Sequence, residues 1–308
     1  MRRITIVEVG PRDGLQNERA SIATADKIEL VDRLSAANLP VIEVSAFVNP
    51  ARVPQMADAA AVFAGITRKP GIRYTALVPN LKGLARAVDA GVTEIAIVAA
   101  ATDAFSRANI NQSVDESLVL YQEVCNRAAA LGVRVRAYLS TAFGCPYEGD
   151  VSPDHVADLA ARLVEMGAFE VAVSDTIGVA HPGLVQTVLD AVLNRVPVRA
   201  VALHLHDTRG MALANVLTAL PFGVSTFDAS VGGLGGCPFA PGAAGNLATS
   251  ELLYMLNGLN IDTGVSLEGL SGAATFIASK LDRPLASRYA QAEAARSAQR
   301  LGASASSP

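Results

Sequence analysis

The sequence predicts an α/β fold, a closed (β/α)8 (TIM) barrel with a C-terminal helical extension. Short apolar runs rich in β-branched residues alternate with longer segments of helical periodicity, and eight such runs occur along the chain. This alternation is typical of a parallel sheet, and eight units fit a closed barrel. The 308 residues are 51% hydrophobic and 18% charged, as expected for strands that are covered on both faces.

The predicted strands follow one another at 4–9, 41–44, 74–77, 94–98, 133–139, 170–173, 200–204 and 225–229. Helical periodicity between them is clearest at 24–37, 114–130 and 153–166. An open doubly wound sheet is the alternative, but such a sheet usually carries a Gly-rich phosphate turn after its first strand. The turn at 10–18 carries charged residues instead, which favours the barrel.

The chain beyond the eighth predicted strand continues with helices and a tail. A Gly-rich segment at 232–242 leads toward a further helix, and the helical pattern over 258–285 is expected to cap the barrel. We therefore assign 1–286 to one barrel domain that includes these helices. Residues 287–308 are rich in Ala and Ser, and we expect this tail to be partly disordered.

Composition and charge exclude several classes of function. The formal net charge is −4 and no run of Lys or Arg occurs, so we expect no nucleic-acid partner. The three cysteines are too few for a disulfide framework and indicate a reducing compartment. A strand pattern begins almost at the N-terminus and no apolar run could span a bilayer, so we expect a cytoplasmic protein with no membrane partner.

The most informative segment is 201–210, which reads as a buried strand that continues into a polar turn. His204 and His206 lie two residues apart, and alternate residues of a strand face the same side. Two imidazoles at the carboxyl end of a strand are half of a metal site, whereas the alternative is a pair of buried, hydrogen-bonded histidines. We favour the metal because two of the four histidines occur here, with Asp207 directly after them.

Further polar residues follow other predicted strands, and in a barrel the carboxyl ends of the strands meet at one face. Asp13 follows the first strand and Asn246 follows the eighth. Alone, Asp13 is equally well explained as a turn residue, and Asn246 as the N-cap of the next helix. Together with the two histidines they give two oxygen and two nitrogen donors, which suit Mg²⁺ or Mn²⁺ at a catalytic site.

Three more polar residues belong to the same predicted face. Glu43 lies inside the second strand, Asn80 follows the third, and Asp175 follows the sixth. Each carboxylate has an alternative interpretation as the partner of a buried Arg or Lys. We expect all three side chains at the same rim of the barrel, because the carboxyl ends of its strands meet at one face.

Four segments of the chain resemble 3-hydroxy-3-methylglutaryl-CoA lyases, which belong to a wider group of metal-dependent Claisen-type lyases and synthases. They are 8–18 (EVGPRDGLQNE), 174–178 (SDTIG), 204–208 (HLHDT) and 232–238 (GGLGGCP). The resemblance extends over about 4–281. It implies cleavage of 3-hydroxy-3-methylglutaryl-CoA to acetyl-CoA and acetoacetate, as in leucine catabolism, usually by a homodimer.

The resemblance also implies roles for individual residues. Asp13, His204, His206 and Asn246 are the implied metal ligands, and Glu43 and Asp175 match acidic positions beside the metal. Arg12 is expected to face the thioester carbonyl, and Cys237 to act as the acid or base on a mobile loop. Gln16, Asn80 and Tyr138 are expected to bind the substrate.

The chemistry explains these residue types. The C3 hydroxyl must lose its proton, for which His204, or Asp13 through a water, is the candidate base. Enolate charge then develops on the thioester oxygen, next to the permanent cation of Arg12. Cys237 would protonate the enolate, although an ordinary loop thiol is the alternative; we interpret Cys145 as structural and Cys125 as packing.

The chain departs from the family where small hydroxyl residues often stand near the substrate, because it has Ala46 and Ala172 there. The segment 281–285 is also less basic than expected for contacts to the CoA tail. One alternative is therefore a lyase for a different 3-hydroxyacyl-CoA. A synthase that runs the reaction toward condensation, and a non-catalytic barrel that binds metal or CoA, are the others.

Overall fold

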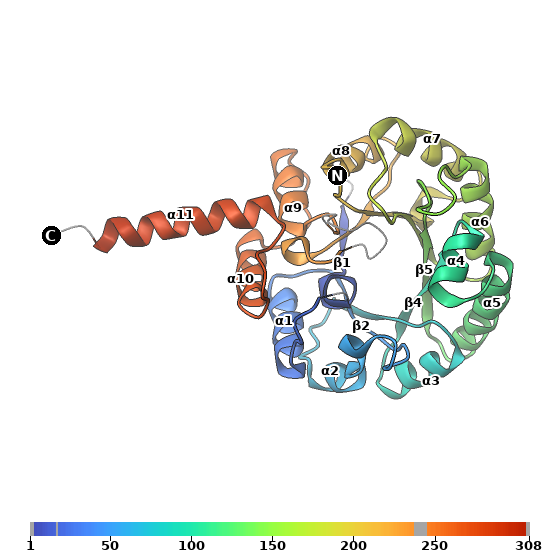
Figure 1. Ribbon diagram of the computed structural model, residues 1–308, viewed down its shortest axis with the longest axis horizontal. Coiled ribbons are helices and arrows are strands. Elements are labelled where there is room, and N and C mark those ends of the chain that lie inside the picture. Colours follow the sequence, from blue (N-terminus) through green and yellow to red (C-terminus); the bar gives the residue numbers. More distant parts are fainter. Residues whose placement is uncertain (1–2, 17, 237–244, 306–308) are drawn as a thin grey trace.

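Eight parallel strands form a closed barrel in the order β1-β2-β3-β4-β5-β6-β7-β8, so the predicted (β/α)8 fold is confirmed (Figure 1). The structure is a computed structural model that describes residues 3–16, 18–236 and 245–305. The strands are β1 (Thr5–Glu8), β2 (Val41–Ala46), β3 (Arg73–Leu77), β4 (Glu94–Ala100), β5 (Arg134–Ser140), β6 (Glu170–Asp175), β7 (Val201–Leu205) and β8 (Thr226–Ala229). Pairing of β1 with β8 closes the ring, with Thr5 opposite Thr226.

Helices surround the strands as an outer ring (Figure 1). The α-helices of the described chain are α1 (Thr24–Ala36), α2 (Ala59–Gly65), α3 (Leu81–Asp89), α4 (Asp103–Ile110), α5 (Val114–Ala130), α6 (Pro153–Glu165), α7 (Pro182–Leu193), α8 (Ala212–Ala219), α9 (Thr249–Gly258), α10 (Leu267–Ala278) and α11 (Arg288–Ala305), of which α11 lies outside the ring (Figure 1). The predicted helix at 114–130 has the bounds of α5, which begins at a capping box formed by Ser113 and Glu116. In the part of the chain that the structure describes, no helix is both long and apolar enough to cross a membrane.

The carboxyl ends of three strands lie two residues beyond their predicted bounds. β2, β4 and β6 each continue two residues further than the apolar runs at 41–44, 94–98 and 170–173. The added residues are small or polar, so hydropathy alone did not mark them. They still pair with the neighbouring strand, as Asp175 does with Leu205. These extensions carry polar side chains to the rim of the barrel.

The C-terminal part of the chain packs beside the barrel and then leaves it. α10 lies against α1 at the side of the ring, and α11 extends away from the barrel (Figure 1). Helix α11 falls within the segment 287–308 that the sequence assigns to a tail. The division of the chain at residue 286 stays a prediction.

Candidate active site

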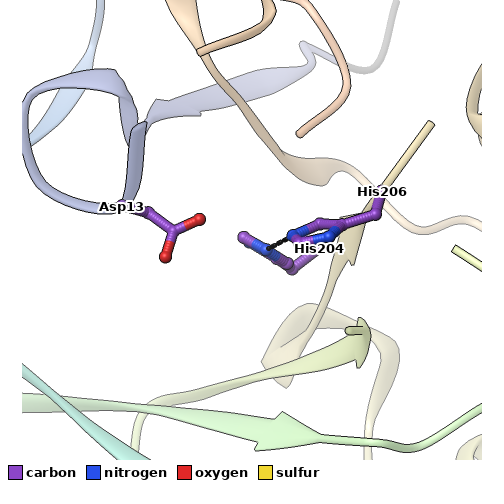
Figure 2. Close-up of side chains that lie close together, drawn as sticks. All are labelled: Asp13, His204 and His206. Atoms are coloured by element: carbon purple, nitrogen blue, oxygen red, sulfur yellow. Dashed lines mark hydrogen bonds between the residues drawn. The ribbon is translucent and has the colours of Figure 1, made fainter. Parts of the chain in front are cut away.

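His204 and His206 stand at the end of β7 with both imidazoles on the same side of the strand (Figure 2). Their Nε2 atoms are 3.2 Å apart, and both residues are buried. Burial and the neighbouring His204 lower the pKa of His206 to about 4, so its ring is neutral at pH 7. A neutral imidazole keeps the lone pair that a metal ligand requires.

Asp13 faces the two imidazoles from a π-helical turn, η1 (Gly10–Gly14), that follows β1 (Figure 2). The N–H of Gly14 donates to the carbonyl of Val9 and closes this turn. One ligand atom from each of Asp13, His204 and His206 lies within 4.8 Å of the others. This three-residue cluster fits a metal ion, and its mixture of carboxylate and imidazole donors without thiolate suits Mg²⁺ or Mn²⁺.

The Asp13 carboxylate is charged in this setting. Burial alone would raise the pKa of Asp13, but Arg12 and the two histidines hold it well below its ordinary value. Asn246 adds a hydrogen bond from Nδ2 to Asp13 Oδ2, at 2.8 Å. The turn therefore presents a carboxylate that needs no proton removed before it can bind a cation.

Asn246 lies beside Asp13 although 233 residues separate them in the chain. Its Nδ2 also donates to the carbonyl of Leu234 at 3.1 Å, and its backbone pairs with His206. Helix α9 begins at Thr249 after Ala248, so Asn246 is not the N-cap that the alternative interpretation required. Because both acceptors engage the amide nitrogen, the amide oxygen is the atom that could join a metal site.

Arg12 is fixed between two carboxylates on the wall of the same site. Its Nε donates to Glu43 Oε2 and its Nη1 to Asp13 Oδ1, each at 2.6 Å. The Tyr138 hydroxyl donates to Glu43 Oε2 at 3.2 Å, and the Arg12 guanidinium lies 5.4 Å from the centre of that ring. Glu43 is therefore the partner of a buried arginine, as its alternative interpretation proposed, and it also borders the predicted site.

Asp175 has a different environment from the other predicted carboxylates. Its two oxygens accept the backbone N–H groups of Val179 and Ala180, at 2.9 and 3.1 Å. Burial raises the pKa of Asp175 to about 6. Its side chain thus fastens the loop after β6, while the neighbouring Ser174 and Thr176 line the cavity described next.

A cavity of about 590 Å³ opens above these residues at the carboxyl end of the barrel. Its lining includes Arg12, Asp13, Gln16, Asn80, Tyr138, His204 and His206. The cavity therefore contains the three residues that we predicted to bind substrate. Gln16 Oε1 is buried with no hydrogen-bond partner among the described residues, whereas Asn80 also caps α3 by accepting the N–H of Gly83. Ala46 and Ala172 are fully buried in β2 and β6.

Cys237 lies outside the described residues. The described chain stops before it at Gly236, which is part of the cavity lining. The structure therefore places the residue before Cys237 at the cavity, and the role of Cys237 stays a prediction. The other two cysteines, Cys125 and Cys145, are both buried and free.

Sequence reasoning missed three buried charged residues that support the site. Asp228 in β8 contacts His204, and Arg136 in β5 contacts Asp228. Glu8 accepts the N–H groups of Gly10 and Val231 and the hydroxyl of Thr249, which ties the Asp13 turn to the segments after β8. The available signal was a charged residue inside an apolar strand, which we followed for Glu43 but not for these three.

Comparison with known proteins gives the family of the chain. The HMGL-like family model matches residues 3–277. The chain belongs to the HMGL-like family. The mitochondrial hydroxymethylglutaryl-CoA lyase of Rattus norvegicus is 54% identical over 291 residues, which cover 94% of this chain and 90% of the rat protein. The cytoplasmic 3-hydroxy-3-methylglutaryl-CoA lyase of the same species is 50% identical over 289 residues, which cover 94% and 84%.

Solved structures in the family agree with this assignment. The crystal structure of hydroxymethylglutaryl-CoA lyase from Pseudomonas aeruginosa matches with a TM-score of 0.94 and 51% identity. The match covers 96% of this chain and 98% of that protein. The arrangement of strands and helices described above is thus that of an HMG-CoA lyase over almost the full length of both chains.

Proposed function

We propose that this chain is a carbon–carbon lyase that cleaves 3-hydroxy-3-methylglutaryl-CoA to acetyl-CoA and acetoacetate. The observation that carries the proposal is the cluster of Asp13, His204 and His206 beside Arg12 at one end of a closed barrel. Membership of the HMGL-like family, with relatives named for this activity at about half identity, supports the same substrate. The relatives do not favour the alternative of a different 3-hydroxyacyl-CoA.

The metal site of the proposal consists of Asp13, His204, His206 and Asn246, with Mg²⁺ or Mn²⁺ as the ion. When bound, such an ion acts as a Lewis acid that acidifies the C3 hydroxyl and orients it. Asp13 and His206 offer a charged oxygen and a neutral nitrogen, as their lowered pKa values indicate. Asp13, through a water, would then accept the hydroxyl proton; His204 is the other candidate, and it could do so only with an Nε2 that is not bound to the ion.

Arg12 stabilises the second charge of the proposed reaction, that of the enolate. Its guanidinium is held by Glu43 and Asp13, so it presents a fixed cation to the thioester oxygen on which enolate charge develops. Its planar fork contacts two carboxylates at once, which the ammonium of a lysine could not reproduce. Glu43 and Tyr138 therefore position Arg12, and Asp175 holds the neighbouring loop in place.

Proton delivery to the enolate completes the reaction. We assign it to Cys237, because this residue directly follows Gly236, which is part of the cavity lining. A loop that covers the cavity would also exclude water from the carbanion. Gln16, Asn80 and Tyr138 line the cavity and are proposed to bind the substrate.

Three further parts of the proposal concern the protein in the cell. We propose a homodimer, a cytoplasmic location and a role in leucine catabolism. The relatives include both mitochondrial and cytoplasmic lyases. Light scattering of the purified protein tests the dimer, and microscopy of the tagged protein in its native cell tests the location.

The activity is tested with purified protein, 3-hydroxy-3-methylglutaryl-CoA and either Mg²⁺ or Mn²⁺. Mass spectrometry should show acetyl-CoA and acetoacetate in equal amounts, and a chelator should abolish the reaction until the ion is restored. Absence of both products with either ion would contradict the proposal. A panel of other 3-hydroxyacyl-CoA esters completes the test, since a much larger kcat/KM for another acyl group would overturn the substrate assignment.

A further inference from the structure

His204 has a second contact on the side of its ring that faces away from His206. Its Nδ1 lies 3.1 Å from Asp228 Oδ2, and the Asp228 side chain is completely buried. This contact joins the ends of two neighbouring strands, because His204 pairs with Asp228 across β7 and β8. The outer nitrogen of one predicted metal ligand is thus held by a buried carboxylate.

Asp228 is held in turn by Arg136. Two nitrogens of the guanidinium donate to the two oxygens of Asp228, Nη2 to Oδ1 at 2.7 Å and Nη1 to Oδ2 at 3.1 Å. The third, Nε, donates to Glu170 Oε1 at 2.7 Å. Arg136 therefore contacts two buried carboxylates through different edges of one planar group, and only one of them touches a histidine.

The two histidines differ in how their rings are fixed. An ionised carboxylate can only accept hydrogen bonds, so the contact with Asp228 places the His204 proton on Nδ1. The lone pair of His204 then lies on Nε2, the atom that faces His206 and Asp13. His206 Nδ1, in contrast, is buried and has no hydrogen-bond partner within the described ranges. Of the two histidines, His204 alone therefore has its outer nitrogen held by a hydrogen-bond partner among the described residues.

We propose that Asp228 and Arg136 are positioning residues that set the metal affinity of the site by holding His204 in this tautomer. The inference rests on the proposed function, in which His204 is a metal ligand. Replacing a carboxylate that accepts the outer N–H of a ligating histidine commonly lowers metal affinity by about 10- to 100-fold. Arg136 acts one step further out, because its fork keeps both oxygens of Asp228 in place.

The test compares Asp228→Asn with Glu170→Gln. In the first variant the amide oxygen stays with Arg136, so the amide N–H group faces His204 Nδ1 and moves the ring proton to Nε2. The second removes the charge of the other buried partner of the same arginine but leaves Asp228 unchanged. Both variants should lower the free energy of unfolding, because each removes one charge from a buried ion pair. Only Asp228→Asn should change the histidine.

Mn²⁺ binding without substrate is the readout, followed by electron paramagnetic resonance of the free ion. We expect the Kd for Mn²⁺ to rise roughly 10- to 100-fold in Asp228→Asn. In Glu170→Gln the Kd should stay within about twofold of that of the unmodified protein, because Asp228, which contacts His204, is unchanged. Equal Kd values in Asp228→Asn and the unmodified protein, or equal losses in both variants, would overturn the proposal.

Arg136→Lys decides the question if Asp228→Asn does not fold. It keeps the positive charge but cannot contact both oxygens of Asp228, so the Kd should rise, though less than in the asparagine variant. Nitrogen-15 spectra of the metal-free protein add a direct readout, because they report which imidazole nitrogen carries the proton. A His204 proton on Nε2 in the unmodified protein would contradict the inference. Failure of the unmodified protein to bind Mn²⁺ would instead contradict the proposed ligand set.

Discussion

Arg12 and Glu43 form an ion pair of 2.6 Å in which both side chains are buried. The pair connects the turn after β1 with the middle of β2, and its arginine lines the cavity that the two histidines also line. Burial raises the pKa of Glu43, and the adjacent guanidinium opposes that rise through its charge and its hydrogen bond. The guanidinium is therefore oriented before any substrate arrives.

This relationship predicts the outcome of Arg12→Lys. The variant keeps a positive charge near Asp13 but loses the fork that contacts Glu43, so kcat should fall on the order of 10²–10³-fold. Steady-state kinetics give the change, and Arg33→Lys, on the exposed face of α1, serves as the matched control. An unchanged kcat in Arg12→Lys would show that the guanidinium does not stabilise the enolate.

The metal ligands predict a second result. His204→Ala should abolish Mn²⁺ binding at concentrations that saturate the unmodified protein, because it removes one of the few donors of the site. Isothermal titration calorimetry measures the loss. His181→Ser is the control, since His181 caps α7 and serine can replace it as a cap. Stoichiometric Mn²⁺ binding in His204→Ala would exclude this histidine as a ligand.

Cys237 provides a third test, which does not depend on the position of its loop. Cys237→Ala should lose most of kcat but keep the Mn²⁺ affinity of the unmodified protein, because proton delivery and metal binding use different groups. Cys145→Ser is the control, as this buried thiol accepts a hydrogen bond from Thr102 that a hydroxyl can also accept. Full turnover in Cys237→Ala would refute the assigned role.

Glu8 predicts how stability changes with pH. Burial raises its pKa from 4.5 to about 7, despite three hydrogen bonds that oppose the shift. The folded protein therefore binds more protons at Glu8 than the unfolded chain does between pH 4.5 and 7. The free energy of unfolding should fall as the pH rises through this range, by about 3 kcal/mol from this one group.

The pH effect of Glu8 is isolated by comparison with Glu8→Gln, which cannot ionise. Urea unfolding at pH 5 and at pH 8 should show the unmodified protein losing stability relative to the variant at the higher pH. A constant difference between the two proteins would mean that Glu8 keeps the same charge on folding across this range. In the variant the amide nitrogen would face the Thr249 hydroxyl as a donor, as the protonated carboxyl group of Glu8 does at pH 5.

The site residues that could be predicted are those that lie at the carboxyl ends of strands. His204 and His206 follow from the two-residue period of a strand, and Asp13 joins them because parallel strands end at one rim. The contact of Asp13 with Asn246 was predictable for the same reason, since closure of a barrel brings its first and last strands together. The three predicted substrate residues also line the cavity.

The parts that could not be predicted depend on which side chains meet inside the barrel. Arg136 and Asp228 are 92 residues apart, and only the three-dimensional curvature of the sheet brings β5 and β8 within reach of each other. Asp175 is a second example, in which the position of the residue was predicted but its contacts were not. Its position at the end of β6 was predicted, but the loop that folds back onto its carboxylate was not.

The contact between Asp13 and Asn246 has a consequence for the folding of the chain. These two groups come from the segments that follow the first and the last strand, on either side of the seam between β1 and β8. A partly folded chain in which that seam is still open keeps Asn246 paired with His206 but lacks the Asp13 carboxylate beside them. Mn²⁺ uptake during refolding should therefore lag behind helix formation and mark the moment at which the ring closes.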